Sequence, residues 1–511
     1  MLGIGKLMNN KKKFFLNGMV AVSMTLLMRA VGMALNAYIS SRLGAAAMGL
    51  ITLVMSVYGF AVTFASSGIN LAVTRMVAEA IGVNDGEKAI KSMRLCLAYA
   101  AFFGLLASVI LFFSSNYIGK NWLGDERTVT SLKFLALSLT PIAISSALSG
   151  YFTAVRRVTK SALASVFEQA VKIFLTIYGL MIFAPRGIEY ACLSVVGGAS
   201  LAEFGSFFLS FCMYLYDRHR HLHFKGKKRK HTGLAKYMFS ITLPVAFSSY
   251  FRSALVTIEH MLIPRGLRKN GADADRALAA YGTLHGMALP LVLFPGAIPF
   301  SFASLIIPEV AERHATGNNG SIQRVIEKVF RVTLSFSIGA AVVMFTFSDE
   351  LGRLIYSSEE AGLYIRFLSP LVPVMYLDNA VDAVLKGMGE QLASMKINIA
   401  DAALCVILVY FLTPVIGLYG YVITIFVSEL MNIVLSIRKL SKISDFSVKP
   451  IEWVLIPFLI SFSLCYFSSA LFSHVFTFST SVAEIIFTVL LVTGGFWLCT
   501  FRTRKVKSIK Q

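Results

Sequence analysis

Long apolar runs separated by short polar segments follow one another along the whole 511-residue chain. Most runs hold the roughly 20 residues that a helix needs to cross a hydrocarbon layer about 30 Å thick. This pattern predicts an all-α polytopic membrane protein with fourteen transmembrane helices. The predicted spans are 14–41, 46–70, 92–113, 131–154, 161–183, 189–215, 238–263, 278–307, 325–347, 361–386, 396–413, 417–438, 452–472 and 480–500. The first span is too long for a cleaved signal peptide and lacks a small-residue cleavage site.

Composition supports the same class of protein. Hydrophobic residues make up 56% of the chain and charged residues 15%, and the mean hydropathy is +0.70. A soluble protein would carry roughly 25% charged residues. We find no Walker loop, no metal-ligand spacing and no Ser/His/Asp set, which predicts a transporter without a cofactor rather than an enzyme. No disulfide is expected among the six cysteines, which are Cys96, Cys192, Cys212, Cys405, Cys465 and Cys499.

Basic residues in the predicted loops orient the chain. With the N-terminus placed in the cytoplasm, the inner loops hold 33 Lys and Arg residues and the outer loops hold 9. This asymmetry predicts an even number of spans and two cytoplasmic termini in a bacterial cytoplasmic membrane. It also explains most of the net charge of +21. The run "KGKKRKH" (225–231) is expected to lie against anionic membrane lipids rather than to bind nucleic acid.

The chain also matches itself. Four charged positions in the first six predicted spans have counterparts of the same charge in the next six. The matched pairs are Arg29 with Arg252, Arg42 with Arg265, Glu168 with Asp401, and Glu203 with Glu429. The repeat predicts two six-helix pseudo-symmetric lobes about an axis along the membrane normal. The predicted parts are 1–216 (first lobe), 217–237 (basic cytoplasmic linker), 238–440 (second lobe) and 450–511 (helices thirteen and fourteen with a basic cytoplasmic tail).

Arg29 and Arg252 fall near the middle of their spans. A charge there costs a few kcal/mol unless it faces a protein interior or a wet cavity. We therefore expect the two arginines to face each other across a central cavity and to bind an anion. A guanidinium group offers a planar fork of donors that fits phosphate oxygens. The alternative is a structural role, in which each arginine bonds backbone carbonyls or a neighbouring carboxylate.

Other charged residues in or near the spans have weaker patterns. Arg42 and Arg265, at outer span ends, suit interfacial anchoring, with substrate binding as the alternative. Candidates for gating or for coupling to a proton or a sodium ion are Glu168, Lys172, Glu259, Asp378, Asp382 and Asp401. Within this set, the spacing i, i+4 favours a helix pair between Glu168 and Lys172. Glu259, seven residues after Arg252, could form a salt bridge with it. The prolines of span 278–307 predict a bent, flexible helix.

Three stretches carry a resemblance to a known family. They are "TLLMRAVGMALNAYISSRLG", "SGINLAVTRMVAEA", and "AAYGTLHGMALPLVLFPGAI" followed by "LIIPEVAE". The chain resembles the multidrug/oligosaccharidyl-lipid/polysaccharide (MOP) exporter superfamily, and most closely its stage V sporulation protein B branch, akin to MurJ lipid II flippases. The resemblance covers nearly the whole chain. It implies a two-lobe flippase that moves undecaprenyl-pyrophosphate-linked sugars outward. Under it, spans thirteen and fourteen form a groove for the lipid tail; the alternative is two simple lipid-facing helices.

The residues carry the resemblance only in part. The stretch "SMTLLMRAVG" (23–32) aligns with the MurJ pattern that holds an essential arginine in the first span, which gives that role to Arg29. Leu35, Val62 and Thr63 stand where MurJ proteins have further arginines. The eighth-span arginine of MurJ has no clear match, and His285, a substrate-binding candidate, is only its neighbour. These departures favour the sporulation or polysaccharide branch over lipid II.

Two other functions compete with a lipid-linked oligosaccharide flippase. A cation-coupled multidrug exporter of the same superfamily usually needs an acidic residue in the first-lobe cavity, but span 14–41 contains no Asp or Glu. A cationic cavity also repels cationic drugs and attracts phosphates. A membrane scaffold without transport would not need paired arginines at the membrane midplane. The sign of the charge at Arg29 therefore favours the flippase.

Overall fold

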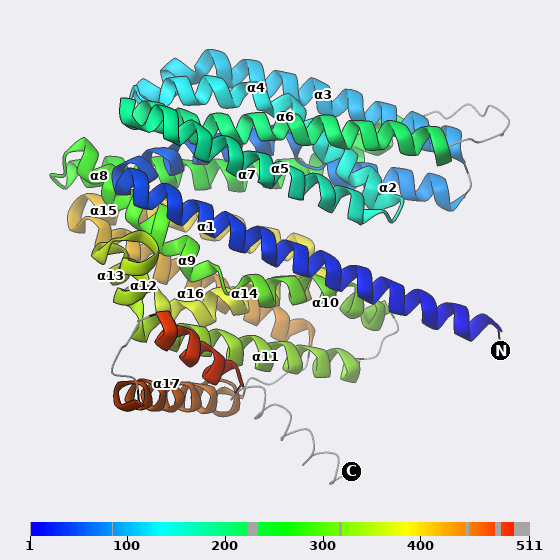
Figure 1. Cartoon of the computed structure of the whole chain (residues 1–511). Helices are drawn as coiled ribbons and strands as arrows, with labels where there is room; N and C mark the ends of the chain where they lie inside the picture. The colour runs from blue at the N-terminus through cyan, green and yellow to red at the C-terminus, as the bar shows by residue number, and fades with distance from the viewer. Residues whose placement is uncertain are drawn as a thin grey trace, which may run out of the picture. The chain divides into compact units, whose positions relative to one another are not determined.

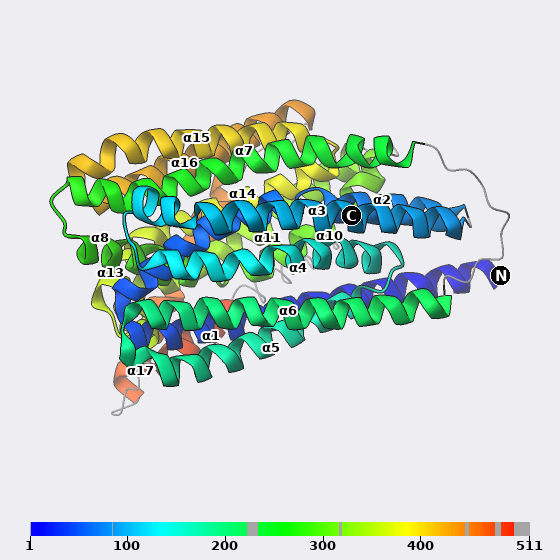
Figure 2. The same ribbon diagram turned by 90° about the horizontal axis from the view of Figure 1, so that it is seen from above.

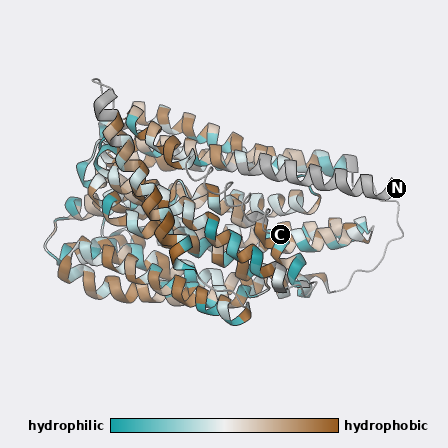
Figure 3. Ribbon diagram, turned by 90° about the horizontal axis from the view of Figure 1, so that it is seen from below, coloured by the Kyte–Doolittle hydropathy of each residue, from teal (hydrophilic) through white to brown (hydrophobic). Residues whose placement is uncertain are grey.

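The computed structural model describes residues 2–83, 85–221, 233–315, 319–444, 449–475 and 482–494, and these ranges contain helices and no strand. The predicted all-α membrane fold is confirmed. The basic run 225–231, Cys499 and all basic residues of the tail lie outside the described residues. Figure 3 shows hydrophobic residues along most of the helix length. This coverage fits helices that are surrounded by lipid rather than by water.

Seventeen numbered α-helices and five short 3₁₀ or π segments follow one another along the described chain, and a further helix, Val482–Gly494, comes after α17. The first part contains α1 (Leu2–Ser66), α2 (Ile69–Gly82), α3 (Gly86–Tyr117), η1 (Ile118–Leu123), α4 (Thr128–Ala154), α5 (Val158–Phe183), η2 (Ala184–Arg186), α6 (Ile188–His221), α7 (Leu234–Lys269) and α8 (Ala274–Tyr281). The second part contains η3 (Gly282–Ala288), α9 (Leu289–Leu293), α10 (Ala297–Ala315), α11 (Asn319–Thr346), α12 (Ser348–Tyr356), α13 (Glu359–Leu368), η4 (Ser369–Leu371), α14 (Val372–Gly387), α15 (Gln391–Ile416), α16 (Leu418–Ile443), η5 (Ile451–Leu455) and α17 (Ile456–Val475).

Eleven helices of the described residues are long and apolar enough to cross a membrane, or twelve with one bent pair. One of them, Leu26–Gly82, holds 57 residues. At 1.5 Å per residue it would measure about 85 Å, more than two crossings of a layer about 30 Å thick. Gly44, with φ 77° and ψ 178°, interrupts this stretch between the first two predicted spans. A shorter apolar helix, Val482–Gly494, lies within the last predicted span. The number fourteen stays a prediction.

Contacts between Cα atoms divide the chain into two compact units. Unit 1 is Met1–Met28, Ala46–Arg265 and Ala274–Leu278. Unit 2 is Arg29–Ala45, Gly266–Asp273 and Ala279–Gln511. The middle of α1 thus clusters with unit 2, although it comes early in the chain, and most of α7 clusters with unit 1. The lobe boundaries derived from sequence repeats stay a prediction.

Unit 1 is a bundle in which α4 packs against α2, α3 and α6, and α5 packs against α6 (Figure 1, Figure 2). Gly150 of α4 permits the close approach to α2, because a Cβ atom there would lie 2.6 Å from the Asn70 backbone oxygen. Two hydrogen bonds also join α2 to α4: Asn70 Nδ2 donates to the Ser146 carbonyl at 3.1 Å, and Thr74 Oγ1 donates to the Gly150 carbonyl at 3.1 Å. Any larger residue at position 150 would push the two helices apart.

Unit 2 is organised around α14, which packs against α10, α11 and α16. Its apolar core includes the fully buried Trp453 of η5, whose ring lies 5.7 Å from that of Phe330 on α11. The residues Ala274–Leu293 and Ala297–Ala303 form a span broken by a 60° bend. Pro290, Pro295 and Pro299 lie around this bend, which agrees with the helix bending expected from the prolines.

Candidate functional site

Arg29 lies on α1 in unit 2, and its side chain is exposed. Its guanidinium carbon lies over the ring of Phe300 on α10, 5.7 Å from the ring centroid. The guanidinium forms neither a hydrogen bond nor an ion pair with any residue that the structure describes. The alternative of a structural arginine held by a carbonyl or a carboxylate therefore has no support from this part of the chain.

Arg252 lies on α7 in unit 1 and is also exposed. Within the described ranges its guanidinium has no hydrogen-bond or ion-pair partner. The expected salt bridge to Glu259 does not form, and Glu259 is buried, with 9% of its surface exposed. The two arginines predicted to lie at the membrane midplane thus both have guanidinium N–H donors that bind no described residue.

The arginines nearer the span ends are engaged. Arg42 stacks its guanidinium carbon 5.7 Å from the centroid of the Tyr38 ring, one turn earlier on α1. Arg265 of α7 donates to the backbone carbonyl of Asn121 in η1, so it ties two segments of unit 1 together. Both contacts suit the anchoring role, and substrate binding by these two residues stays a prediction.

His285 lies on the π-helical segment η3 in unit 2. Its Nε2 atom is 2.6 Å from the hydroxyl of Tyr421 on α16, and its ring packs between those of Tyr281 and Tyr421. A π-helical turn often marks a functional site because it leaves backbone groups without their usual partners. These contacts join the broken span to α16, so the structure gives His285 at least a packing role.

Glu168 and Lys172 of α5 do not form the expected ion pair with each other. Glu168 instead lies next to Glu203 of α6, with Lys172 close to that carboxylate. Glu203 also lies near the buried Tyr58, whose hydroxyl is 2.6 Å from Ser138 Oγ. Unit 1 therefore contains two neighbouring carboxylates and one lysine inside the helix bundle, an arrangement that can exchange a proton or a cation.

Unit 2 contains an acidic cluster at matching helices. Glu429 of α16 lies near Asp378 of α14 and Asp401 of α15. Asp401 accepts a hydrogen bond of 2.6 Å from Ser428 Oγ. Glu203 and Glu429, which the internal repeat paired, thus occur in similar surroundings, and the repeat was the signal that could have placed them among the site residues.

Asp382 lies four residues after Asp378 on α14. Its carboxylate accepts from Lys386 Nζ at 2.5 Å and from the Ser394 hydroxyl. Lys386 follows Asp382 by four residues, a spacing at which side chains meet on one helix face. Asp382 is therefore paired with a cation, and its part in gating or ion coupling stays a prediction.

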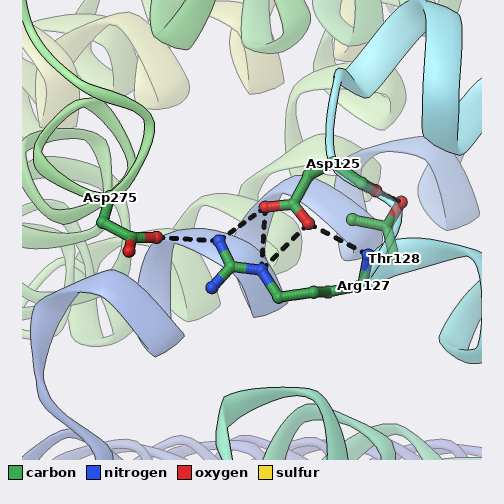
Figure 4. A network of polar contacts seen from close by, with 4 residues as sticks. All are labelled: Asp125, Arg127, Thr128 and Asp275. Carbon is green, nitrogen blue, oxygen red and sulfur yellow. Dashed lines mark hydrogen bonds and ion pairs between the residues drawn. The ribbon is translucent and has the colours of Figure 1, made fainter.

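A polar network that the sequence did not reveal lies where α3 and η1 turn into α4 (Figure 4). Arg127 donates to the carboxylate of Asp125 at 2.7 Å and to that of Asp275 on α8 at 2.8 Å. The hydrogen bonds to Asp125 are the main cause of a raised pKa of Arg127. All of these residues belong to unit 1. No local pattern joins them, since Arg127 and Asp275 are 148 positions apart.

A second unpredicted network holds the end of α6. The carboxylate of Asp217, with 2% of its side chain exposed, accepts from Arg157, from Lys160 Nζ at 2.7 Å and from the Tyr151 hydroxyl at 3.2 Å. Three helices meet at this buried carboxylate.

Within the described ranges, no group of three or more His, Cys, Asp or Glu side chains could hold a metal ion.

Comparison with known proteins agrees with this architecture. The polysaccharide biosynthesis protein family model matches residues 15–314, and the MatE family model matches residues 274–412. The stage V sporulation protein B of Bacillus subtilis (strain 168) is 25% identical over 480 residues, which cover 92% of each chain. The solved structure of the lipid II flippase MurJ in an inward closed conformation covers 96% of this chain and all of its own, with a TM-score of 0.69 at 11% identity.

A multidrug resistance MATE family transporter of the MOP superfamily, in an inward-facing conformation, covers 84% of this chain and all of its own. Its TM-score is 0.62 at 14% identity. The fold and the family matches together define a multi-pass helical membrane transporter of the MOP superfamily, which confirms the resemblance seen in the sequence. Because its model matches more than half of the residues, the chain belongs to the polysaccharide biosynthesis protein family.

Proposed function

We propose that this transporter is an alternating-access flippase, which moves an undecaprenyl-pyrophosphate-linked saccharide outward across the bacterial cytoplasmic membrane. One observation carries the proposal: Arg29 and Arg252 lie on membrane helices, are exposed, and have no hydrogen-bond or ion-pair partner among the described residues. A cation on a membrane helix is costly unless it meets water or an opposite charge. An anionic group of the substrate would supply that charge.

A pyrophosphate suits these two residues chemically. It carries two phosphates, and each guanidinium can donate two parallel hydrogen bonds to phosphate oxygens. We propose that Arg29 and Arg252 each bind one phosphate of the lipid carrier. A charge-assisted bond of this kind contributes about 1.5–3 kcal/mol. The MurJ structure, whose protein is named a lipid II flippase, supports a lipid-linked substrate through its shared fold.

The driving force is proposed to come from a proton or sodium gradient. The Glu168–Lys172–Glu203 cluster in unit 1 and the Asp378–Asp401–Glu429 cluster in unit 2 supply the titratable groups for such coupling. Carboxylates that lie close together favour taking up a proton, because their negative charges repel. Glu259 is kept as a further candidate because it is buried on the helix that carries Arg252.

A cation-coupled multidrug exporter is the second candidate. The MatE model match over residues 274–412 and the acidic cluster of unit 1 favour it. Such exporters bind cationic compounds, which two available arginines would repel. The two functions therefore differ in the charge of the transported molecule.

Reconstitution separates the two candidates. Purified protein in liposomes should move a fluorescent undecaprenyl-pyrophosphate-linked disaccharide between leaflets, and the Arg29→Ala/Arg252→Ala double variant should lose this activity. Lys120→Ala is the matched control, since Lys120 is exposed and pairs with a neighbouring surface carboxylate, Glu126, at 3.1 Å. Transport of ethidium with no movement of the lipid-linked sugar would replace the flippase by the exporter.

A further inference from the structure

The middle of α1 contacts the broken span of unit 2 on both sides of its bend. Before the bend, Asn36 Nδ2 donates to the Gly286 carbonyl in η3 at 2.8 Å. After the bend, Arg29 lies over the ring of Phe300 on α10. Asn36 and Arg29 are seven residues apart, which places them on the same face of a helix. One face of α1 therefore spans the 60° bend.

The position of Phe300 is fixed by the bend itself. A Cβ atom at Gly296 would lie 2.8 Å from the Phe300 ring and 2.8 Å from the Tyr376 ring, so both rings press on the backbone at the break. The two rings meet edge to face with centroids 5.4 Å apart. Tyr376 is fully buried, and its hydroxyl donates to the Val292 carbonyl at 2.6 Å, just before the break. Phe300 therefore packs on the backbone at the break and on Tyr376, whose hydroxyl bonds the segment before the break.

A guanidinium that stacks on a ring face keeps its in-plane donors available. The ring also restricts the rotamers of the long Arg29 side chain, so less conformational entropy is lost when a ligand binds. A change in the bend would move the Phe300 ring, since the ring packs directly on Gly296. The orientation of Arg29 is thereby tied to the geometry of the broken span.

We propose that Phe300 is the positioning residue for Arg29, and that it couples phosphate binding at Arg29 to the bend between α9 and α10. The proposal rests on the proposed function, because it takes Arg29 as a phosphate ligand. A ligand shifts a conformational equilibrium toward the state that binds it better. Bound phosphate favours the bent form, in which Phe300 holds the guanidinium. Asn36 keeps α1 in register with the other side of the bend.

Binding of farnesyl pyrophosphate, a soluble isoprenyl pyrophosphate, tests the positioning role. Phe300→Leu should weaken its affinity about three- to tenfold, the loss of one cation–π contact, while Phe300→Tyr keeps the ring and restores affinity. Phe302→Leu is the matched control, because Phe302 lies on the same helix and is 56% exposed. Phe300→Met replaces the leucine variant if that variant does not fold.

Spin labels at Ala274 and Glu312 of a cysteine-free protein report the bend. Farnesyl pyrophosphate should shift their distance distribution to one bent population in the wild type and in Phe300→Tyr, but not in Phe300→Leu. Wild-type protein that does not bind the probe would overturn the proposed function. Wild-type binding with equal affinity in Phe300→Leu, or with no ligand-dependent change in distance, would overturn the coupling through Phe300 alone.

Discussion

Arg127 and Asp275 form an ion pair of 2.8 Å between segments that are 148 residues apart in the sequence (Figure 4). The same guanidinium binds Asp125 at 2.7 Å. The two carboxylates differ in environment, since the side chain of Asp125 is 7% exposed and that of Asp275 is 66% exposed. Arg127 therefore compensates one buried charge and one charge that water already solvates.

This difference predicts unequal effects on stability. Arg127→Ala should lower the free energy of unfolding by about 1–3 kcal/mol, because it leaves the buried Asp125 carboxylate without its cation. Asp275→Ala should cost about 0–1 kcal/mol, as for other exposed ion pairs. Thermal unfolding of the purified variants in detergent measures both changes. Equal losses would show that Asp125 gains nothing from Arg127.

The stability that Arg127 contributes should also have a defined dependence on pH. Because its pKa is raised on folding, Arg127 contributes stability that is present below its unfolded pKa and lost only as pH rises through the folded value. Both pKa values of Arg127, folded and unfolded, lie well above pH 10. The difference between the wild type and Arg127→Ala should therefore stay constant from pH 7 to pH 10.

The buried carboxylate at the end of α6 gives a second stability prediction. Asp217→Ala should cost about 3 kcal/mol, the lower end for a broken buried pair, because Arg157 and Lys160 are 36% and 26% exposed and can still reach water. Asp217→Asn should cost less, since the amide oxygen still accepts from Tyr151. Thermal unfolding ranks the two variants, and the reverse order would contradict the assignment of a charged carboxylate at this position.

The sequence predicted the fold class correctly because the length of an apolar run is a local property. Gly44 is an example: it breaks the helical backbone with φ 77°, and it lies between the first two spans predicted from the sequence. Partners of charged residues are less predictable still. Lys386 follows Asp382 by one turn and was visible in the sequence, whereas nothing local joins Arg127 to Asp275.

The residues of the candidate site also differ in how well the sequence predicts them. The internal repeat singled out Arg29, Arg252, Glu203 and Glu429, because a charge within an apolar run stands out from its neighbours. Phe300 has no such signal, as it is one of 41 phenylalanines in the chain. Its contact with Arg29 depends on the rotation of two helices about their axes, and that rotation is set by packing between distant segments.

The topology predicts which loops can be labelled from outside the cell. Cysteine at position 126, an exposed site after η1, should react with a membrane-impermeant maleimide in intact cells. Cysteine at position 83, 69% exposed after α2, should react only after the membrane is opened. The physical basis is the excess of Lys and Arg in the loops predicted to be cytoplasmic. The opposite labelling pattern would invert the proposed direction of transport.

For Arg252, the prediction concerns the shape of the side chain as well as its charge. Arg252→Lys should lose almost as much transport as Arg252→Ala, because lysine keeps the charge but loses the planar fork of donors. Flipping of the fluorescent lipid-linked disaccharide in liposomes, corrected for the amount of protein inserted, measures the loss. Full activity of the lysine variant would reduce Arg252 to a general electrostatic role.

Arg29 gives the sharpest distinction between a binding residue and a structural one. Its guanidinium lies over the Phe300 ring and forms neither a hydrogen bond nor an ion pair with the described residues, so Arg29→Ala removes a costly charge and should leave the melting temperature nearly unchanged. Substrate affinity should fall about tenfold or more, the loss of one charge-assisted bond to phosphate. Both quantities can be measured on one purified preparation, with farnesyl pyrophosphate as the ligand. A structural arginine would give the reverse result, in which the variant unfolds at a lower temperature and whatever remains folded binds the pyrophosphate normally.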